Sequence, residues 1–184
     1  MTREKSEKSE KSLKIILGDI CYPKSEALII PANTKGIMSR GNVSRIVKHG
    51  WKGLAEEAKV VAEAEDVQVG DYFTTGPGRL KRRGVKKIYH AVIKRLPSDY
   101  TSINIVTSII RKVMHQVIKD QMKSVTICGI GIEPGDLDKR VVAKVTYDMC
   151  NRLQDQINIK IMDNDLEFIK EICSFHGEKY ERSR

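Results

Sequence analysis

The chain has 184 residues, of which 40% are hydrophobic and 31% charged. This length and composition suit one globular domain with a full core and exclude a wholly disordered chain. The formal net charge of +9 favours phosphate-bearing or polyanionic partners. The sequence contains no long apolar run and no secretory signal, so we expect no membrane association and a cytoplasmic location.

A polar tail precedes the first regular pattern. The segment TREKSEKSEKS alternates charges and contains no hydrophobic residue, so we expect residues 1–12 to be a disordered tail and residues 13–184 to be a single domain. LKIIL (Leu13–Leu17) and ALIIPAN (Ala27–Asn33) then predict two strands. The second is wholly apolar until its end, which is typical of a strand buried on both faces of a sheet.

A helix and a basic hairpin come next. Apolar residues at helical spacing over 42–62 predict a helix that is interrupted near Trp51, and we expect Trp51 to anchor a helix in the core. DYFTTGPGRL and KKIYHAVIK predict strands on either side of the basic segment RLKRRGVKK, residues 79–87. The positive charges of this hairpin could attract nucleic acid or poly(ADP-ribose). The lack of interleaved aromatic residues, apart from Tyr89 nearby, favours a solvated hairpin tip instead.

The remaining elements alternate between helix and strand. They are expected as a helix over 103–122, a strand over 124–130, a helix over 142–153, a strand over 159–162 and a closing helix over 165–172. Such alternation predicts an α/β fold, with a mixed, largely parallel central sheet and helices on both faces in three layers.

Two loops at the carboxyl ends of predicted strands contain several glycines. They are NTKGIMSRGNV, residues 33–43, and CGIGIEPGDLD, residues 128–138. Glycines allow a ligand to approach the backbone, and free amides joined to a helix N-terminus bind anions, so two such loops suit a diphosphate. The alternative is that these glycines only allow tight turns.

Asp19 and Asn33 are polar residues at the ends of apolar strands. The Asp19 carboxylate can accept a hydrogen bond from an exocyclic amine such as that of adenine, and its alternative role is a turn or cap residue. Asn33 can both donate to and accept from a sugar hydroxyl, and its alternative role is an Asx turn that ends the strand.

The sequence resembles the macro domain family from Leu13 to about Phe175. The resemblance is carried by GDI (18–20), ALIIPAN (27–33), RGNV (40–43), CGIGI (128–132) and the closing IKIMDNDLEFIKEI. Macro domains are three-layer α/β/α modules that bind ADP-ribose, and some members hydrolyse ADP-ribosyl groups from proteins or deacetylate O-acetyl-ADP-ribose. The resemblance therefore implies ADP-ribose or an ADP-ribosylated protein as the partner.

The resemblance also implies a role for each matching residue. Asp19 would bind the adenine amine, the Ile20 backbone would lie beside the base, and Asn33 would face the distal ribose as the candidate catalytic residue. The phosphate-binding residues would be, in the first loop, Gly41, Asn42 and Val43, and in the second, Gly129, Ile130, Gly131 and Ile132.

The chain departs from the family pattern in ways that bear on catalysis. Ser44 stands where many hydrolytic members have an acidic residue, and the second loop lacks the aromatic residue that usually stacks on the ribose. The sequence therefore leaves hydrolysis open and also allows a nucleic-acid-binding module without activity. No cofactor or metal is expected, because the four scattered cysteines and four histidines lack the spacing of metal ligands.

Overall fold

The structure is a computed structural model that describes residues 12–183. Within these residues seven strands form a single sheet in the order β3-β4-β2-β5-β6-β1-β7. The strands are β1 (Leu13–Leu17), β2 (Ala27–Asn33), β3 (Tyr72–Thr75), β4 (Lys87–Lys94), β5 (Ser124–Ile127), β6 (Asn158–Asp163) and β7 (Glu181–Arg182). The helices are α1 (Gly41–Gly50), α2 (Lys52–Ala64), the 3₁₀ helix η1 (Gly78–Arg83), α3 (Ile103–Lys119), α4 (Lys139–Leu153) and α5 (Leu166–His176).

The sheet is mixed and largely parallel, as predicted. Only the β3–β4 pair is antiparallel, whereas β4, β2, β5, β6, β1 and β7 run in the same direction. The apolar strand β2 lies between β4 and β5, and Ala27–Ile30 are fully buried. A strand that is covered on both faces needs apolar residues at consecutive positions, which is the pattern of ALIIP.

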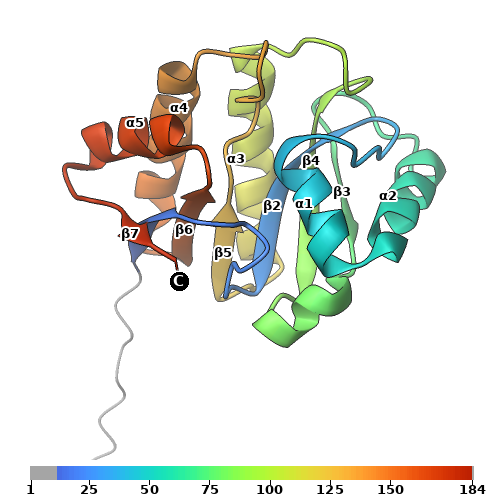
Figure 1. Ribbon diagram of the computed structural model, residues 1–184, viewed down its shortest axis with the longest axis horizontal. Coiled ribbons are helices and arrows are strands. Elements are labelled where there is room, and N and C mark those ends of the chain that lie inside the picture. Colours follow the sequence, from blue (N-terminus) through green and yellow to red (C-terminus); the bar gives the residue numbers. More distant parts are fainter. Residues whose placement is uncertain (1–11, 184) are drawn as a thin grey trace, which may run out of the picture.

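Helices cover both faces of the sheet and complete the three layers (Figure 1). Helices α3, α4 and α5 pack side by side, with α3 against β4 and α5 against β1 and β6. Helices α1 and α2 pack together on the other side, against β2 and β3. No helix among residues 12–183 is long and apolar enough to cross a membrane.

The helices differ in how their N-termini are capped. Ser102, Asp138 and Asp165 each accept a hydrogen bond from a backbone amide of the first turn of α3, α4 and α5. Helix α1 begins after Arg40, which makes no such bond, and its first turn contains no acidic residue. Its first amides therefore remain available to an external acceptor.

Three features differ from the expectations. The basic segment between β3 and β4 folds as η1, because Leu80 is 2% exposed and ties this turn to the core. The expected core position of Trp51 is wrong, because its side chain is 43% exposed between α1 and α2. Of the predicted tail, residues 1–11 lie outside the described residues, whereas Ser12 hydrogen-bonds to Asn158 and extends the sheet.

Candidate functional site

Polar residues gather at one rim of the sheet. Asp19 follows β1, Asn33 ends β2, Lys94 ends β4 and Asp163 ends β6. These four strands are parallel, so their carboxyl ends meet at the same edge, where open α/β sheets bind ligands. Asn33 and Lys94 are also direct neighbours in the β2–β4 register.

The first loop leads into the uncapped helix α1. Gly41 has a φ of +52°, a left-handed conformation that side chains other than glycine adopt at a cost, and it starts the helix. The side chain of Val43 is buried, whereas Asn42 points across to β6. The amides of the first turn therefore face the rim, as an anion site requires.

The second loop is held close to the sheet. Ile130 is fully buried, and the side chain of Ile132 folds over Gly129 so closely that a Cβ on Gly129 would collide with it. The loop continues through Gly131, whose carbonyl accepts from the Leu137 amide at 3.1 Å. The loop is therefore fixed by its own contacts and needs no ligand to order it.

Asp163 joins the two loops. Its Oδ2 accepts from Asn42 Nδ2 at 2.9 Å and from the Gly129 amide at 3.0 Å, while its Oδ1 accepts from the Asp165 amide. The residue is 1% exposed, and burial raises the pKa of its carboxyl in spite of these three bonds. One buried carboxylate thus brings the start of α1 and the second loop together.

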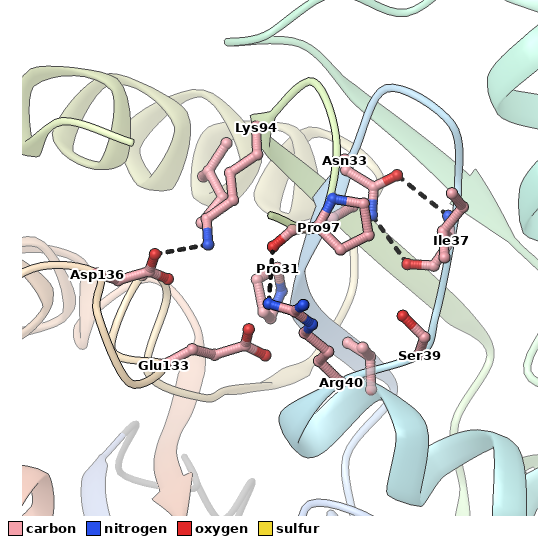
Figure 2. Close-up of a pocket in the computed structure, with 13 residues that line it drawn as sticks. Pro31, Asn33, Ile37, Ser39, Arg40, Lys94, Pro97, Glu133 and Asp136 are labelled. Carbon is pink, nitrogen blue, oxygen red and sulfur yellow. Dashed lines mark hydrogen bonds and ion pairs between the residues drawn. The ribbon is translucent and has the colours of Figure 1, made fainter. Parts of the chain in front are cut away.

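Two cavities open at this rim, on either side of Glu133. The smaller one, of about 40 Å³, is lined by Asn33, Arg40, Lys94 and Asp136 among others (Figure 2). The larger one, of about 240 Å³, is lined by Gly41, Asn42, Arg45, Gly129 and Asp163 among others. Pro31 and Glu133 line both, so the two cavities are parts of a single interrupted cleft.

Glu133 is the residue that interrupts the cleft. Its Oε1 lies against Gly41, where an added Cβ would collide with it. The carboxylate forms no hydrogen bond or ion pair with any described residue. Burial raises the pKa of Glu133. The positive charges of Lys94 and Arg40 oppose this rise, whereas the negative charge of Asp136 adds to it. A carboxylate therefore already occupies the position in front of the uncapped helix.

Lys94 and Asp136 form a buried ion pair in the smaller cavity. Lys94 Nζ lies 2.5 Å from Asp136 Oδ1, and the two side chains are only 9% and 5% exposed. Figure 2 shows the ammonium pointing from the end of β4 across the cavity to the second loop. Asp136 Oδ2 is buried without a partner among the described residues, so one acceptor position stays open.

Asn33 shapes the first loop through its own hydrogen bonds. Its side-chain oxygen accepts from the amides of Lys35 and Ile37, both at 3.1 Å, and its Nδ2 donates to the Ile37 carbonyl at 2.8 Å. The side chain also lines the smaller cavity. A primary amide has two donor hydrogens, so one N–H remains for a ligand.

Asp19 is tied to helix α1. Its Oδ2 accepts from Arg45 and its Oδ1 from the Cys21 amide at 2.9 Å. Partial burial alone would raise the pKa of Asp19, but the Arg45 and Cys21 hydrogen bonds outweigh burial and lower it. The carboxylate stays ionised and keeps further acceptor positions, whereas Ile20 is fully buried and offers only its backbone.

The structure brings the residues singled out in the sequence to one rim and adds four others. Sequence reasoning missed Glu133, Asp136 and Lys94, and it did not consider Asp163. Lys94 and Asp163 carried a usable signal, since each is a charged residue that closes a buried strand. In the sequence EPGD (133–136), nothing distinguishes Glu133 and Asp136 from ordinary turn residues.

Comparisons with known proteins agree on the kind of fold. The family model described as Macro domain matches residues 29–146. An uncharacterised protein of Aquifex aeolicus (strain VF5) is 26% identical over 155 residues, which cover 84% of this chain and 90% of the relative.

Solved structures similar to the chain include the Oceanobacillus iheyensis macrodomain with ADP, at 15% identity and a TM-score of 0.79, with 92% of each chain covered. A point mutant of that macrodomain with ADPR has 16% identity and a TM-score of 0.77, covering 93% of this chain and 96% of that one. The macrodomain of Thermus aquaticus DarG has 17% identity and a TM-score of 0.71, covering 83% and 98%.

Proposed function

The chain belongs to the macro domain family, and we propose that it binds ADP-ribose in the cleft at the rim of the sheet. The observation that carries this proposal is the Asp163 carboxylate, which holds Asn42 and Gly129 at one point. Both loops are thereby held beside the uncapped first turn of α1, where a diphosphate could lie between them. Structures of similar fold that were solved with ADP and with ADPR support the choice of ligand.

We assign the parts of ADP-ribose to the two cavities. The adenosine half would lie in the larger cavity, beside Arg45 and within reach of its partner Asp19. The diphosphate would face Gly41, Asn42 and Val43 on one side and Gly129 to Ile132 on the other. The distal ribose would enter the smaller cavity, where Asn33 offers one donor.

Glu133 must leave its position for this ligand to bind. Its carboxylate occupies the passage between the cavities, where a diphosphate would bring two more negative charges. The side chain forms no hydrogen bond with any described residue, so it can rotate outward without breaking one. The carboxylate therefore acts as an internal competitor of the phosphates at the N-terminus of α1.

Replacement of this competitor is expected to tighten binding. Glu133→Gln removes one negative charge next to the diphosphate. A like-charge contact in a partly buried site is worth about 1–2 kcal/mol, so we expect about 10-fold higher affinity for ADP-ribose at pH 7.5. Calorimetric titration measures this. Glu178→Gln makes the same charge change on an exposed residue and should leave the affinity unchanged; equal effects of both variants would contradict the role of Glu133.

We further propose that the smaller cavity hydrolyses an O-linked ADP-ribosyl group. Asp136 Oδ2 is an unpartnered acceptor among the described residues and can take a proton from water. The water oxygen would attack the anomeric carbon of the distal ribose, its proton would pass to Asp136, and the bond to the departing oxygen would break with its electron pair. The Lys94 ammonium stabilises that oxygen, and Asn33 orients the ribose.

Calorimetry tests the binding proposal directly. ADP-ribose should bind clearly more tightly than AMP, because AMP lacks the second phosphate and the distal ribose that both loops and Asn33 would hold. Asp19→Ala should weaken ADP-ribose and AMP by the same factor, about 10-fold or less, since both contain adenine. No heat of binding at millimolar ADP-ribose, with the protein folded, would reject the proposed function.

A further inference from the structure

An exposed tryptophan lies among cations at the end of the sheet opposite the cleft. A hollow of about 590 Å³ is lined by Trp51, Gly78, Arg79, Lys81 and Arg82. Helix η1, which carries the three cations, precedes the start of β4, whereas the cleft lies at the end of β4. In Figure 1 η1 is the green helical turn at the bottom, and the loops of the cleft lie at the top.

The position of the indole is fixed by two glycines. A Cβ on Gly53 would collide with the ring, and a Cβ on Gly78 would lie 3.2 Å from it. The Trp51 ring therefore rests on backbone at both places while 43% of the side chain stays exposed. An aromatic ring that is held in place and still exposed is a platform on which a planar ligand can stack without a large loss of side-chain entropy.

The cations around this platform are not neutralised. Arg79, Lys81 and Arg82 are exposed, and none of them pairs with a carboxylate of any residue in 12–183. The next two lysines along the chain, by contrast, are paired, Lys86 with Glu26 and Lys87 with Asp120. The positive charge is thus concentrated on η1 itself.

The positive surface continues beyond η1 into a second hollow of about 970 Å³. Arg83, the last residue of η1, lies 3.7 Å from the ring centre of Tyr22, and both line this hollow. Its other cations are Lys14, Lys24, Lys160 and Arg182, with Glu181 as the single carboxylate among the described residues that line it. Burial lowers the pKa of Lys160, and Lys14 and Lys24 add to the effect, which an anion bound there would relieve.

We infer that this surface, from Trp51 across η1 to the Tyr22 hollow, binds single-stranded nucleic acid. A base stacks on Trp51, and the phosphates on either side contact Arg79, Lys81, Arg82 and the cations of the second hollow. An acidic peptide would satisfy the cations but would leave the indole unused. A duplex would hide its base faces, so the exposed ring favours an unpaired strand.

Trp51 reports on this site directly, because it is the only tryptophan of the chain. Titration with a 15-nucleotide oligothymidylate at low salt should quench its fluorescence to saturation. ADP-ribose should neither cause this quenching nor displace the oligonucleotide, since the cleft lies at the other end of the sheet. The surface is therefore tested separately from the proposed function, and failure of one leaves the other standing.

Variants separate stacking from charge. With a labelled oligonucleotide and anisotropy, Trp51→Leu should weaken binding by about 10-fold and Trp51→Phe should restore most of it, since stacking needs an aromatic ring. Alanine at Arg79, Lys81 and Arg82 together should lower the slope of log affinity against log salt by about 2. The matched control, alanine at the exposed Arg152, Lys170 and Lys179, removes the same charge elsewhere and should change the slope little.

Several results would overturn this inference. They are binding without quenching of Trp51, equal binding of Trp51→Leu and the wild type, and equal losses in the two triple variants. Heparin or polyglutamate that quenches Trp51 as the oligonucleotide does would show a general anion surface. No saturable binding of oligothymidylate at low salt would reject the site altogether.

Discussion

Asp163→Ala is expected to lose both stability and ADP-ribose affinity. The substitution leaves the buried Gly129 amide and the Asn42 side chain without their acceptor, and each unsatisfied buried group costs about 1–3 kcal/mol. Removal of a buried charge offsets part of this, so we expect the free energy of unfolding to fall by about 2–4 kcal/mol. Because the two loops are no longer held together, affinity should fall by about 100-fold or more, which corresponds to about 2.7 kcal/mol.

Asp120→Ala is the matched control. Asp120 also accepts three hydrogen bonds, from Tyr89, Lys87 and Gln116, but it lies at the end of the sheet opposite the cleft. Urea denaturation should show a comparable loss of stability for the two variants, and calorimetry should show loss of affinity only for Asp163→Ala. Equal affinities would mean that Asp163 stabilises the fold without organising the binding site.

The second large effect concerns turnover. Asp136→Asn removes the buried carboxylate oxygen that has no partner among the described residues and that would accept a proton from water beside Lys94. Release of ADP-ribose from an O-linked substrate should therefore slow by about 10²–10⁴-fold, which is the usual contribution of a general base. ADP-ribose affinity should change by about threefold at most, because the amide oxygen still accepts a hydrogen bond. Release of free ADP-ribose, followed by chromatography, measures the rate.

The buried pair needs a neutral double variant as well. Lys94→Gln alone leaves Asp136 as an uncompensated buried charge, which is destabilising, whereas Lys94→Gln with Asp136→Asn removes both charges. The double variant should therefore be more stable than Lys94→Gln in thermal unfolding and equally inactive. If the double variant is about as active as the wild type, this pair takes no part in the chemistry, and Asn33 remains the candidate catalytic residue.

The sheet and the two loops of the proposed site were accessible from the sequence because the central strand β2 is an apolar run and most of the other strands are short and rich in apolar residues. ALIIPAN predicts a central strand, and its final asparagine marks where the apolar run ends. Two adjacent parallel strands necessarily end at the same rim, so two glycine loops after such strands predict a shared site without any coordinates.

The contacts within the site were not accessible from the sequence. Asp163 and Asn42 are 121 residues apart, and no local pattern indicates their hydrogen bond. Glu133 and Asp136 lie in a turn whose composition is ordinary, and only the packing of the second loop against α1 directs them into the cleft. Trp51 was placed wrongly because its ring rests on the backbone at Gly53 and Gly78, and Gly78 comes close to it only in the folded chain.

A crystal structure of the protein soaked with ADP-ribose tests the binding mode most directly. It should show the diphosphate between Gly41 to Val43 and Gly129 to Ile132, and the Glu133 side chain turned out of the passage between the cavities. ADP-ribose bound away from these two loops, or an empty cleft with Glu133 still against Gly41 at saturating ligand, would contradict the account.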